Sequence, residues 1–295
     1  MTNNCDVKPL NFQEIIEKLA EVNQWLCQIG LNRPDRIRSH LRNLTELAKA
    51  HDRETPDQIA VNLTSERRRE RFWSIVESIE FVDATSASRR GEFEIPKQVL
   101  EKALNGPADL YLENHKSNEG RNTMFEIVVG GLAASAGLSP LLGAEPDVSF
   151  EFENRRILVQ CKRVLSKASI DTRIKEAAKQ LNRDLVKSSN PRDCGLIAIC
   201  LSRLINPGDR IFSFTAVVDV ECALKHEIRK VADEHHERVF PEVKNPKIAG
   251  ILLYMATPVF VSEHGFTVAH SAMVCPIPGK SDVRLLKALA SILKT

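Results

Sequence analysis

The sequence predicts an α/β fold in which a sheet-containing domain, residues 116–295, follows an all-α N-terminal domain, residues 1–115. Two observations lead to this expectation. In the first part, apolar residues recur at the spacing of amphipathic helices. In the second part, helical segments alternate with runs that are apolar at every position, which is typical of strands covered by helices on both faces of a sheet. With 295 residues, the chain is long enough for two domains.

The N-terminal part is expected to consist of helices with recognisable ends. Leu19, Val22 and Leu26 follow helical spacing, and Gly30 is a suitable residue for the end of that helix. Thr55, which precedes a proline, indicates the start of a further helix. The predicted helical segments of this part are 11–30, 33–52, 55–81 and 94–106.

The C-terminal part is expected to form one sheet with helices packed over it. A helix is predicted for residues 117–138, followed by a β-hairpin over 145–163 and a basic helix over 169–189. The remaining predicted elements are strands in the segments 194–205, 246–261 and 265–275 and an amphipathic helix over 281–294.

The composition is that of a soluble globular protein, with 43% hydrophobic and 27% charged residues. The longest apolar runs are shorter than the roughly 20 residues that cross a bilayer, and the first residues lack the pattern of a secretion signal. The seven cysteines show no metal-ligand spacing, which disfavours a structural zinc site and a disulfide framework. We therefore expect a cytoplasmic protein without a membrane partner. GxxxxGK[ST], HExxH and GxSxG motifs are absent, which disfavours ATP-driven translocation, zinc-protease and α/β-hydrolase chemistry.

Positive charge is concentrated in one part of the sequence. Residues 1–115 contain 16 Lys and Arg against 19 Asp and Glu, whereas the whole chain has a net charge of +2. Between Arg155 and Arg192 there are eleven basic and three acidic residues. Such a local excess is a plausible footprint for a polyanion.

The predicted hairpin brings polar side chains together at its open end. If Asn154 and Arg155 form the turn, Asp147 lies opposite Lys162. Alternation along the strands puts Gln160 on the same face as these two residues. The sequence therefore predicts one polar patch that contains Asp147, Gln160 and Lys162.

Glu126 is the only ionisable residue between residues 122 and 144, in a helix that is apolar nearly all round. A buried carboxylate is costly unless it is paired or binds a metal. We therefore expect a cationic partner for Glu126, either Lys162 or a divalent metal held by Asp147.

Three short motifs follow one another in this region: a glutamate on a helix, a Pro-Asp pair before a strand, and a Gln-x-Lys triplet on the next strand. They are Glu126, Pro146-Asp147 and Gln160-Cys161-Lys162. This order resembles the PD-(D/E)xK nuclease superfamily, in the variant where glutamine replaces the acidic residue of the last motif, as in Mrr-type and VRR-type nucleases. The resemblance covers residues 117–205 and implies a restriction-endonuclease-like mixed β-sheet core flanked by helices.

The resemblance also implies a site and an activity. Asp147, Gln160, the backbone carbonyl of Cys161 and Glu126 would hold Mg²⁺ or Mn²⁺, and Lys162 would orient the attacking water. The reaction would be hydrolysis of DNA phosphodiester bonds, and the chain would act as a restriction or phage-defence effector. Double-stranded DNA would be the main partner, with a second copy of the chain or a defence-system protein as further partners. A neutral glutamine at position 160 should weaken metal binding relative to a carboxylate.

The basic helix offers candidate phosphate contacts. Lys175, Lys179 and Arg183 recur every four residues and form a slowly winding ridge. Gln180 matches in position a glutamine that some relatives carry near the substrate, and Arg163 at the end of the hairpin is a further candidate for nucleic-acid binding. An exposed helix with solvated charges is the alternative interpretation of this ridge.

Other functions remain open at this point. The chain could be a nuclease-fold protein that binds nucleic acid without cutting it, or an interaction protein in which the acidic helical domain matters most. Each candidate residue also has a structural interpretation: Asp147 as a turn residue, Lys162 as a surface lysine and Glu126 as half of an ion pair.

Overall fold

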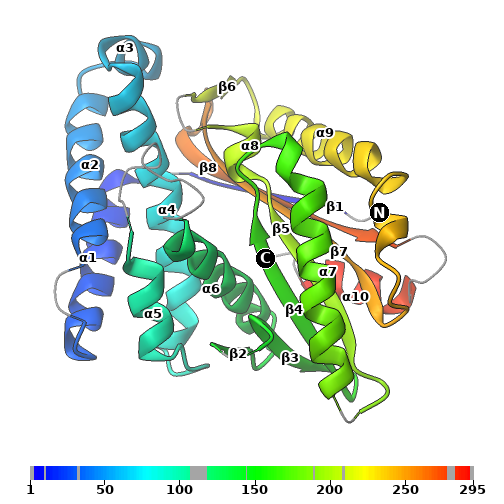
Figure 1. Ribbon diagram of the computed structural model, residues 1–295. Helices are drawn as coiled ribbons and strands as arrows, with labels where there is room; N and C mark the ends of the chain where they lie inside the picture. The colour runs from blue at the N-terminus through cyan, green and yellow to red at the C-terminus, as the bar shows by residue number, and fades with distance from the viewer. Residues whose placement is uncertain are drawn as a thin grey trace.

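The computed structural model describes residues 3–9, 11–31, 34–106, 118–143, 145–188, 190–207, 210–277 and 283–292. Within these residues, one mixed sheet has helices packed on both faces (Figure 1). The predicted α/β fold is therefore confirmed. The strand order is β1-β8-β7-β5-β4-β3-β2, with β6 paired to β7 beside this path.

The centre of the sheet is parallel and its edges are antiparallel. Strand β5 runs parallel to both β4 and β7, whereas β2-β3-β4 and β7-β8-β1 are antiparallel. The central strands are buried along nearly their whole length, which explains their continuous apolar sequences. The strands are β1 (Asn3–Pro9), β2 (Leu141–Leu142), β3 (Val148–Phe152), β4 (Arg155–Arg163), β5 (Cys194–Cys200), β6 (Phe212–Phe214), β7 (Ile248–Val261) and β8 (Gly265–Pro276).

Most helices match the predicted segments. They are α1 (Phe12–Gln28), α2 (Asp35–His51), α3 (Pro56–Asn62), α4 (Ser65–Arg89), α5 (Lys97–Leu104), α6 (Glu119–Ser135), α7 (Ile170–Lys187), α8 (Ser202–Ile205), α9 (Val217–His236) and α10 (Val283–Ile292), with 3-10 turns at Lys167–Ser169 and Phe240–Glu242. The single helix expected over residues 55–81 is two, because Leu63 is extended and the Thr64 side chain caps α4 separately. None of the helices in the described ranges has the length and apolarity needed to cross a bilayer.

The two faces of the sheet carry different helices. Helices α1–α6 pack on one face and α7 and α9 on the other, as Figure 1 shows. On β4, Val159 and Cys161 face α6, whereas Leu158, and Val164 directly after the strand, face α7. The strand therefore directs Gln160 and Lys162 towards the α7 side, because side chains alternate along it.

The N-terminal part is not purely helical, since β1 pairs with β8 at the edge of the sheet. Its sequence, NNCDVKP, alternates polar and apolar residues from Asn4 to Lys8, and pairing with β8 supplies its backbone hydrogen bonds. Helices α1, α2, α4 and α5 share one hydrophobic cluster with the sheet. The proposed domain boundary at residue 115 stays a prediction, because residues 107–117 lie outside the described ranges.

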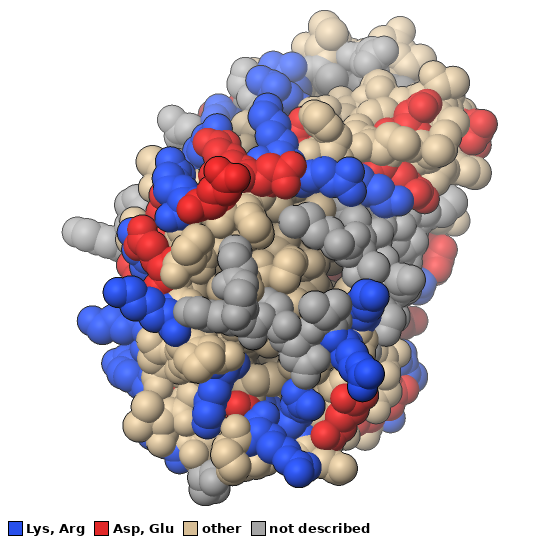
Figure 2. All heavy atoms as spheres, turned by 90° about the vertical axis from the view of Figure 1, so that its right-hand side faces the viewer, with Lys and Arg blue, Asp and Glu red and all other residues tan. Residues whose placement is uncertain are grey.

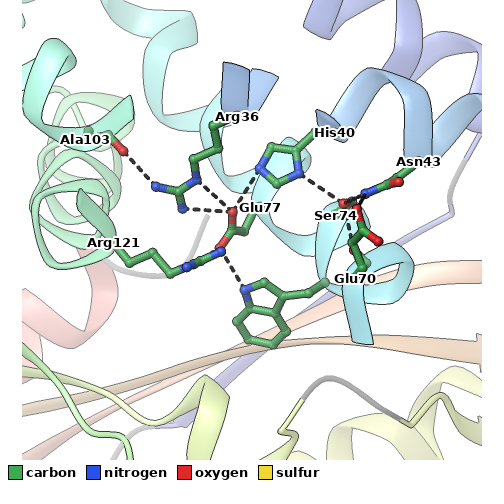
Figure 3. A network of polar contacts seen from close by, with 9 residues as sticks. Arg36, His40, Asn43, Glu70, Ser74, Glu77, Ala103 and Arg121 are labelled. Carbon is green, nitrogen blue, oxygen red and sulfur yellow. Dashed lines mark hydrogen bonds and ion pairs between the residues drawn. The ribbon is translucent and has the colours of Figure 1, made fainter. Parts of the chain in front are cut away.

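A buried ionic cluster holds the N-terminal helices against α6 (Figure 3). Glu77 of α4 accepts hydrogen bonds from Arg36 at 2.8 and 3.1 Å, from the Trp73 indole at 2.8 Å and from Arg121 of α6. His40 Nε2 lies 2.9 Å from Glu77 Oε2. Burial alone would raise the pKa of Glu77, but the two guanidinium groups hold it well below its usual value.

Close backbone contact also fixes the position of α6. A Cβ atom at Gly131 would lie only 2.7 Å from the Cα of Ala84 in α4, so only glycine permits this approach of the two helices. The ion cluster and this contact together set the place of α6, and α6 carries Glu126.

Candidate functional site

The turn of the β3-β4 hairpin lies one residue earlier than predicted. Glu153 and Asn154 both have positive φ angles, 48° and 60°, as in two-residue turns that suit the twist of a hairpin. Phe152 consequently pairs with Arg155, and Arg155 belongs to the strand. The predicted turn at Asn154 and Arg155 is therefore wrong.

The new turn moves each strand partner by two residues. Val148 pairs with Val159, so Asp147 lies opposite Gln160, and the predicted pairing of Asp147 with Lys162 is also wrong. A shift of two residues nevertheless leaves each side chain on the same face. The structure thus brings Asp147, Gln160 and Lys162 together, as the alternation of the strands predicted.

The three side chains and one backbone amide form a connected group. Lys162 Nζ lies 3.7 Å from Asp147 Oδ2 and donates a 3.4 Å hydrogen bond to Gln160 Oε1. The Cys161 N–H donates to Asp147 Oδ2 at 2.8 Å. Gln160 is only 3% exposed, so its amide is held within the protein.

Glu126 lies on α6, and its charge interacts with the charges of Asp147 and Lys162. Burial and then the Asp147 charge raise the pKa of Glu126 to about 8, against the opposing effect of Lys102 and Lys162. Burial also raises the pKa of Asp147, although Lys162 and the Cys161 amide partly offset this. Glu126 therefore keeps its proton at neutral pH unless positive charge is added nearby.

The oxygen atoms of this group suit a hard divalent cation. In a β-strand, the N–H and C=O of one residue point to the same side, so the Cys161 carbonyl faces Asp147 as its N–H does. The Asp147 and Glu126 carboxyls and the Gln160 amide add further oxygen donors, which is the donor type that Mg²⁺ and Mn²⁺ prefer. Within the described residues, no three or more His, Cys, Asp or Glu side chains are grouped so that they could hold a metal ion, so a cation here would depend on neutral oxygens and water for its remaining ligands.

Asp184 belongs to the group and was missed by sequence reasoning. It lies on α7, is 8% exposed and accepts a 3.2 Å hydrogen bond from Gln160 Nε2. A signal was available, because Asp184 lies in the apolar stripe that includes Leu181 and Leu185, where a carboxylate needs a partner. The partner could not be named, since it comes from a different element.

A pocket of about 380 Å³ lies beside the group, between the hairpin and the C-terminal half of α7. Asp184 lines it together with Pro146, Arg156, Lys187 and Asp193. Arg156 donates to Ser149, and Asp193 accepts from the Arg156 backbone N–H. The polar wall of this pocket therefore adjoins the group through Asp184.

The predicted basic ridge is exposed but partly neutralised. Lys175, Lys179 and Arg183 are exposed on α7, and Lys175 Nζ forms an ion pair with Glu242 at 2.7 Å. Figure 2 shows a face on which basic side chains are interspersed with acidic ones. Gln180 is half-buried, and its Oε1 has no hydrogen-bond partner among the residues that the structure describes.

Arg163 does not belong to this exposed ridge. It is 7% exposed and lines an interior hollow with Arg36, Glu77 and Glu80. The alternation that directs Lys162 towards α7 turns Arg163 towards the N-terminal helices instead. As placed here, Arg163 does not reach a surface-bound nucleic acid, contrary to the prediction.

Comparisons of the chain with protein-family models, with curated proteins and with solved structures gave no match. A function for this chain therefore has to be inferred from the geometry of Asp147, Gln160 and Lys162 and from the charge of Glu126.

Proposed function

We propose that the chain is a metal-dependent endonuclease that hydrolyses DNA phosphodiester bonds. The observation that carries the proposal is the convergence of Asp147, Gln160 and Lys162, together with the interaction of their charges with Glu126 on α6. A half-buried carboxyl whose raised pKa depends in part on a second carboxylate is typical of functional sites. A structural ion pair would require only one acid and one base.

The order of elements around the group supports a restriction-endonuclease-like core. Helix α6 is followed by the antiparallel strands β2, β3 and β4, and α7 then leads to β5, which is parallel to β4. The candidate residues lie on α6, directly before β3 and on β4, as the resemblance to the PD-(D/E)xK superfamily implies.

The side chains suggest a division of roles. Asp147, Gln160, the Cys161 carbonyl and Glu126 would hold Mg²⁺ or Mn²⁺, and the bound ion would supply a more acidic water and neutralise charge on the phosphate. Lys162 would hydrogen-bond the attacking water and stabilise negative charge on a phosphate oxygen. Glu126 would bind the ion only in its deprotonated form, so its raised pKa makes metal binding compete with a proton near neutral pH.

The substrate and partners follow from the same proposal. Lys179 and Arg183 on α7 would contact backbone phosphates of double-stranded DNA, without reading its sequence. A homodimer, a defence-system partner and a cytoplasmic, antiviral role stay predictions.

A second candidate function is nucleic-acid binding without cleavage. Lys162 Nζ lies close to two of the oxygen atoms that would bind a metal, 3.7 Å from Asp147 Oδ2 and 3.4 Å from Gln160 Oε1. Its positive charge therefore competes with a metal ion for these oxygens. With glutamine at position 160, the group contains fewer carboxylates to overcome that competition.

Cleavage of supercoiled plasmid in Mg²⁺, in Mn²⁺ and in EDTA tests the proposal. We expect metal-dependent nicking or linearisation, reduced roughly 10²–10³-fold in Asp147→Asn and in Lys162→Ala. Lys230→Ala is the matched control, because Lys230 is an exposed lysine on α9.

Cleavage that persists in Asp147→Asn and Lys162→Ala would refute the assigned site. DNA binding that is sensitive to salt, with no cleavage under any condition, would favour the second candidate function.

A further inference from the structure

The side-chain amide of Gln160 lies between two groups of opposite charge. Its Nε2 donates to Asp184 Oδ2 at 3.2 Å, and its Oε1 accepts from Lys162 Nζ at 3.4 Å. The carboxylate can only accept hydrogen bonds, and the ammonium can only donate them. A rotation of the amide by 180° would place oxygen against Asp184 and N–H against Lys162, so both neighbours oppose it.

The orientation selected in this way presents the amide oxygen to the rest of the group. Asp147 lies opposite Gln160 across the hairpin, and Lys162 is on the same face. The oxygen therefore points to the place where the carboxylate of Asp147 is also directed, while the amide nitrogen points to α7.

Asp184 also changes the electronic character of this oxygen. A carboxylate that accepts from the amide N–H₂ group draws electron density towards the carbonyl oxygen, as happens in chains of polarised hydrogen bonds. Residues that hydrogen-bond metal ligands orient them and raise their basicity in the same way. Asp184 is close enough to Asp147 for its charge to add to the raised pKa of that carboxyl.

We propose that Asp184 is a positioning residue that fixes the Gln160 amide with its oxygen towards Asp147 and Lys162, and so lets a neutral glutamine act as a cation ligand. The orientation stands on the hydrogen bonds alone, whereas its use for a cation rests on the proposed function. Asp184 itself is turned to the amide nitrogen and acts through Gln160.

An exchange of the two side chains tests the orientation without any metal. Gln160→Glu alone places two carboxylates together, and Asp184→Asn alone removes the charge that selects the amide orientation. The double variant Gln160→Glu/Asp184→Asn again has one carboxylate and one amide. The carboxylate is then on β4, and the amide N–H that donates to it is on α7. In EDTA, we expect the double variant to have a higher Tm than Gln160→Glu. We also expect its loss of stability to be smaller than the sum of the losses in the two single variants, which is the coupling between the two positions.

Binding of Mn²⁺, measured by isothermal titration calorimetry with MnCl₂, tests the consequence for a cation. We expect Asp184→Asn to bind Mn²⁺ ten- to a hundredfold more weakly than the native chain, and the double variant to recover this loss. Asp193→Asn is the matched control, since Asp193 is a buried neighbour that bonds Ser188 and the Arg156 amide.

The outcomes separate the two proposals. No coupling in EDTA, with the double variant as unstable as the sum of the single variants, overturns the positioning role. Equal Mn²⁺ affinity in Asp184→Asn and the native chain overturns its role for a cation. A native chain that shows coupling in EDTA but binds no Mn²⁺ and cuts no DNA would refute the proposed nuclease, while the orientation by Asp184 would stand.

Discussion

Replacement of Glu126 by glutamine should stabilise the protein, and the gain should grow with pH. Glu126 has a folded-state pKa of about 8 against a reference value of 4.5. Such a group favours folding most below the reference pKa, and this contribution is lost as the pH rises through the folded-state value. Glutamine cannot ionise, so Glu126→Gln removes the loss.

The size of the effect follows from the difference between the two pKa values. At about 1.4 kcal/mol per pKa unit, the gain in free energy of unfolding is about 1 kcal/mol at pH 5 and about 3 kcal/mol at pH 7. Any constant difference between the two side chains cancels when the two pH values are compared. The prediction is therefore an increase of about 2 kcal/mol between pH 5 and pH 7.

Urea unfolding in EDTA at pH 5, 6, 7 and 8, followed by circular dichroism, measures this increase. Glu176→Gln is the control, because Glu176 is an exposed carboxylate on α7 and should change the stability little at any pH. A difference between Glu126→Gln and the native chain that does not change with pH, or that falls as the pH rises, would contradict the burial of this carboxyl.

Two further predictions concern the packing that positions α6, and both are measured by urea unfolding at pH 7. Glu77→Gln should cost roughly 3–5 kcal/mol, because it leaves two buried guanidinium groups without a carboxylate, whereas Glu70→Gln, which loses a partly exposed ion pair, should cost less than about 1 kcal/mol. Equal losses in these two variants would show that the buried cluster is not the stronger one. Gly131→Ala should cost about 1–3 kcal/mol, because the new Cβ would lie 2.7 Å from the Cα of Ala84, and the exposed Ser135→Ala on the same helix is its control. A neutral Gly131→Ala would mean that α4 and α6 can move apart without cost.

The predicted stability gain on replacing Glu126 agrees with a role of this residue in function. Because burial raises the pKa of Glu126, this carboxyl lowers the stability of the fold at neutral pH. Residues that break a local rule in this way are expected at functional sites, where the cost is offset elsewhere.

The helices and the buried strands could be predicted because their signals are local. The spacing of Leu19, Val22 and Leu26 identifies α1, and the continuous apolar run of β7 identifies a strand buried on both faces. Helix α9 is not among the predicted segments, although Val220, Leu224 and Ile228 recur at helical spacing. Strand β1 has only a short alternation of polar and apolar residues, and its pairing with β8, near the other end of the sequence, could not be predicted from that segment.

The candidate site divides in the same way. Alternation along two neighbouring strands is a local property, so the sequence alone determined that Asp147, Gln160 and Lys162 share a face, even though the turn was misplaced by one residue. The tertiary structure decided that Asp184 lies against Gln160 and that Arg163 is buried. These two features depend on which distant helices pack on each face of β4. The protonation of Glu126 depends in the same way on burial and on the charges of residues from other elements, and these charges are not encoded in the sequence around Glu126.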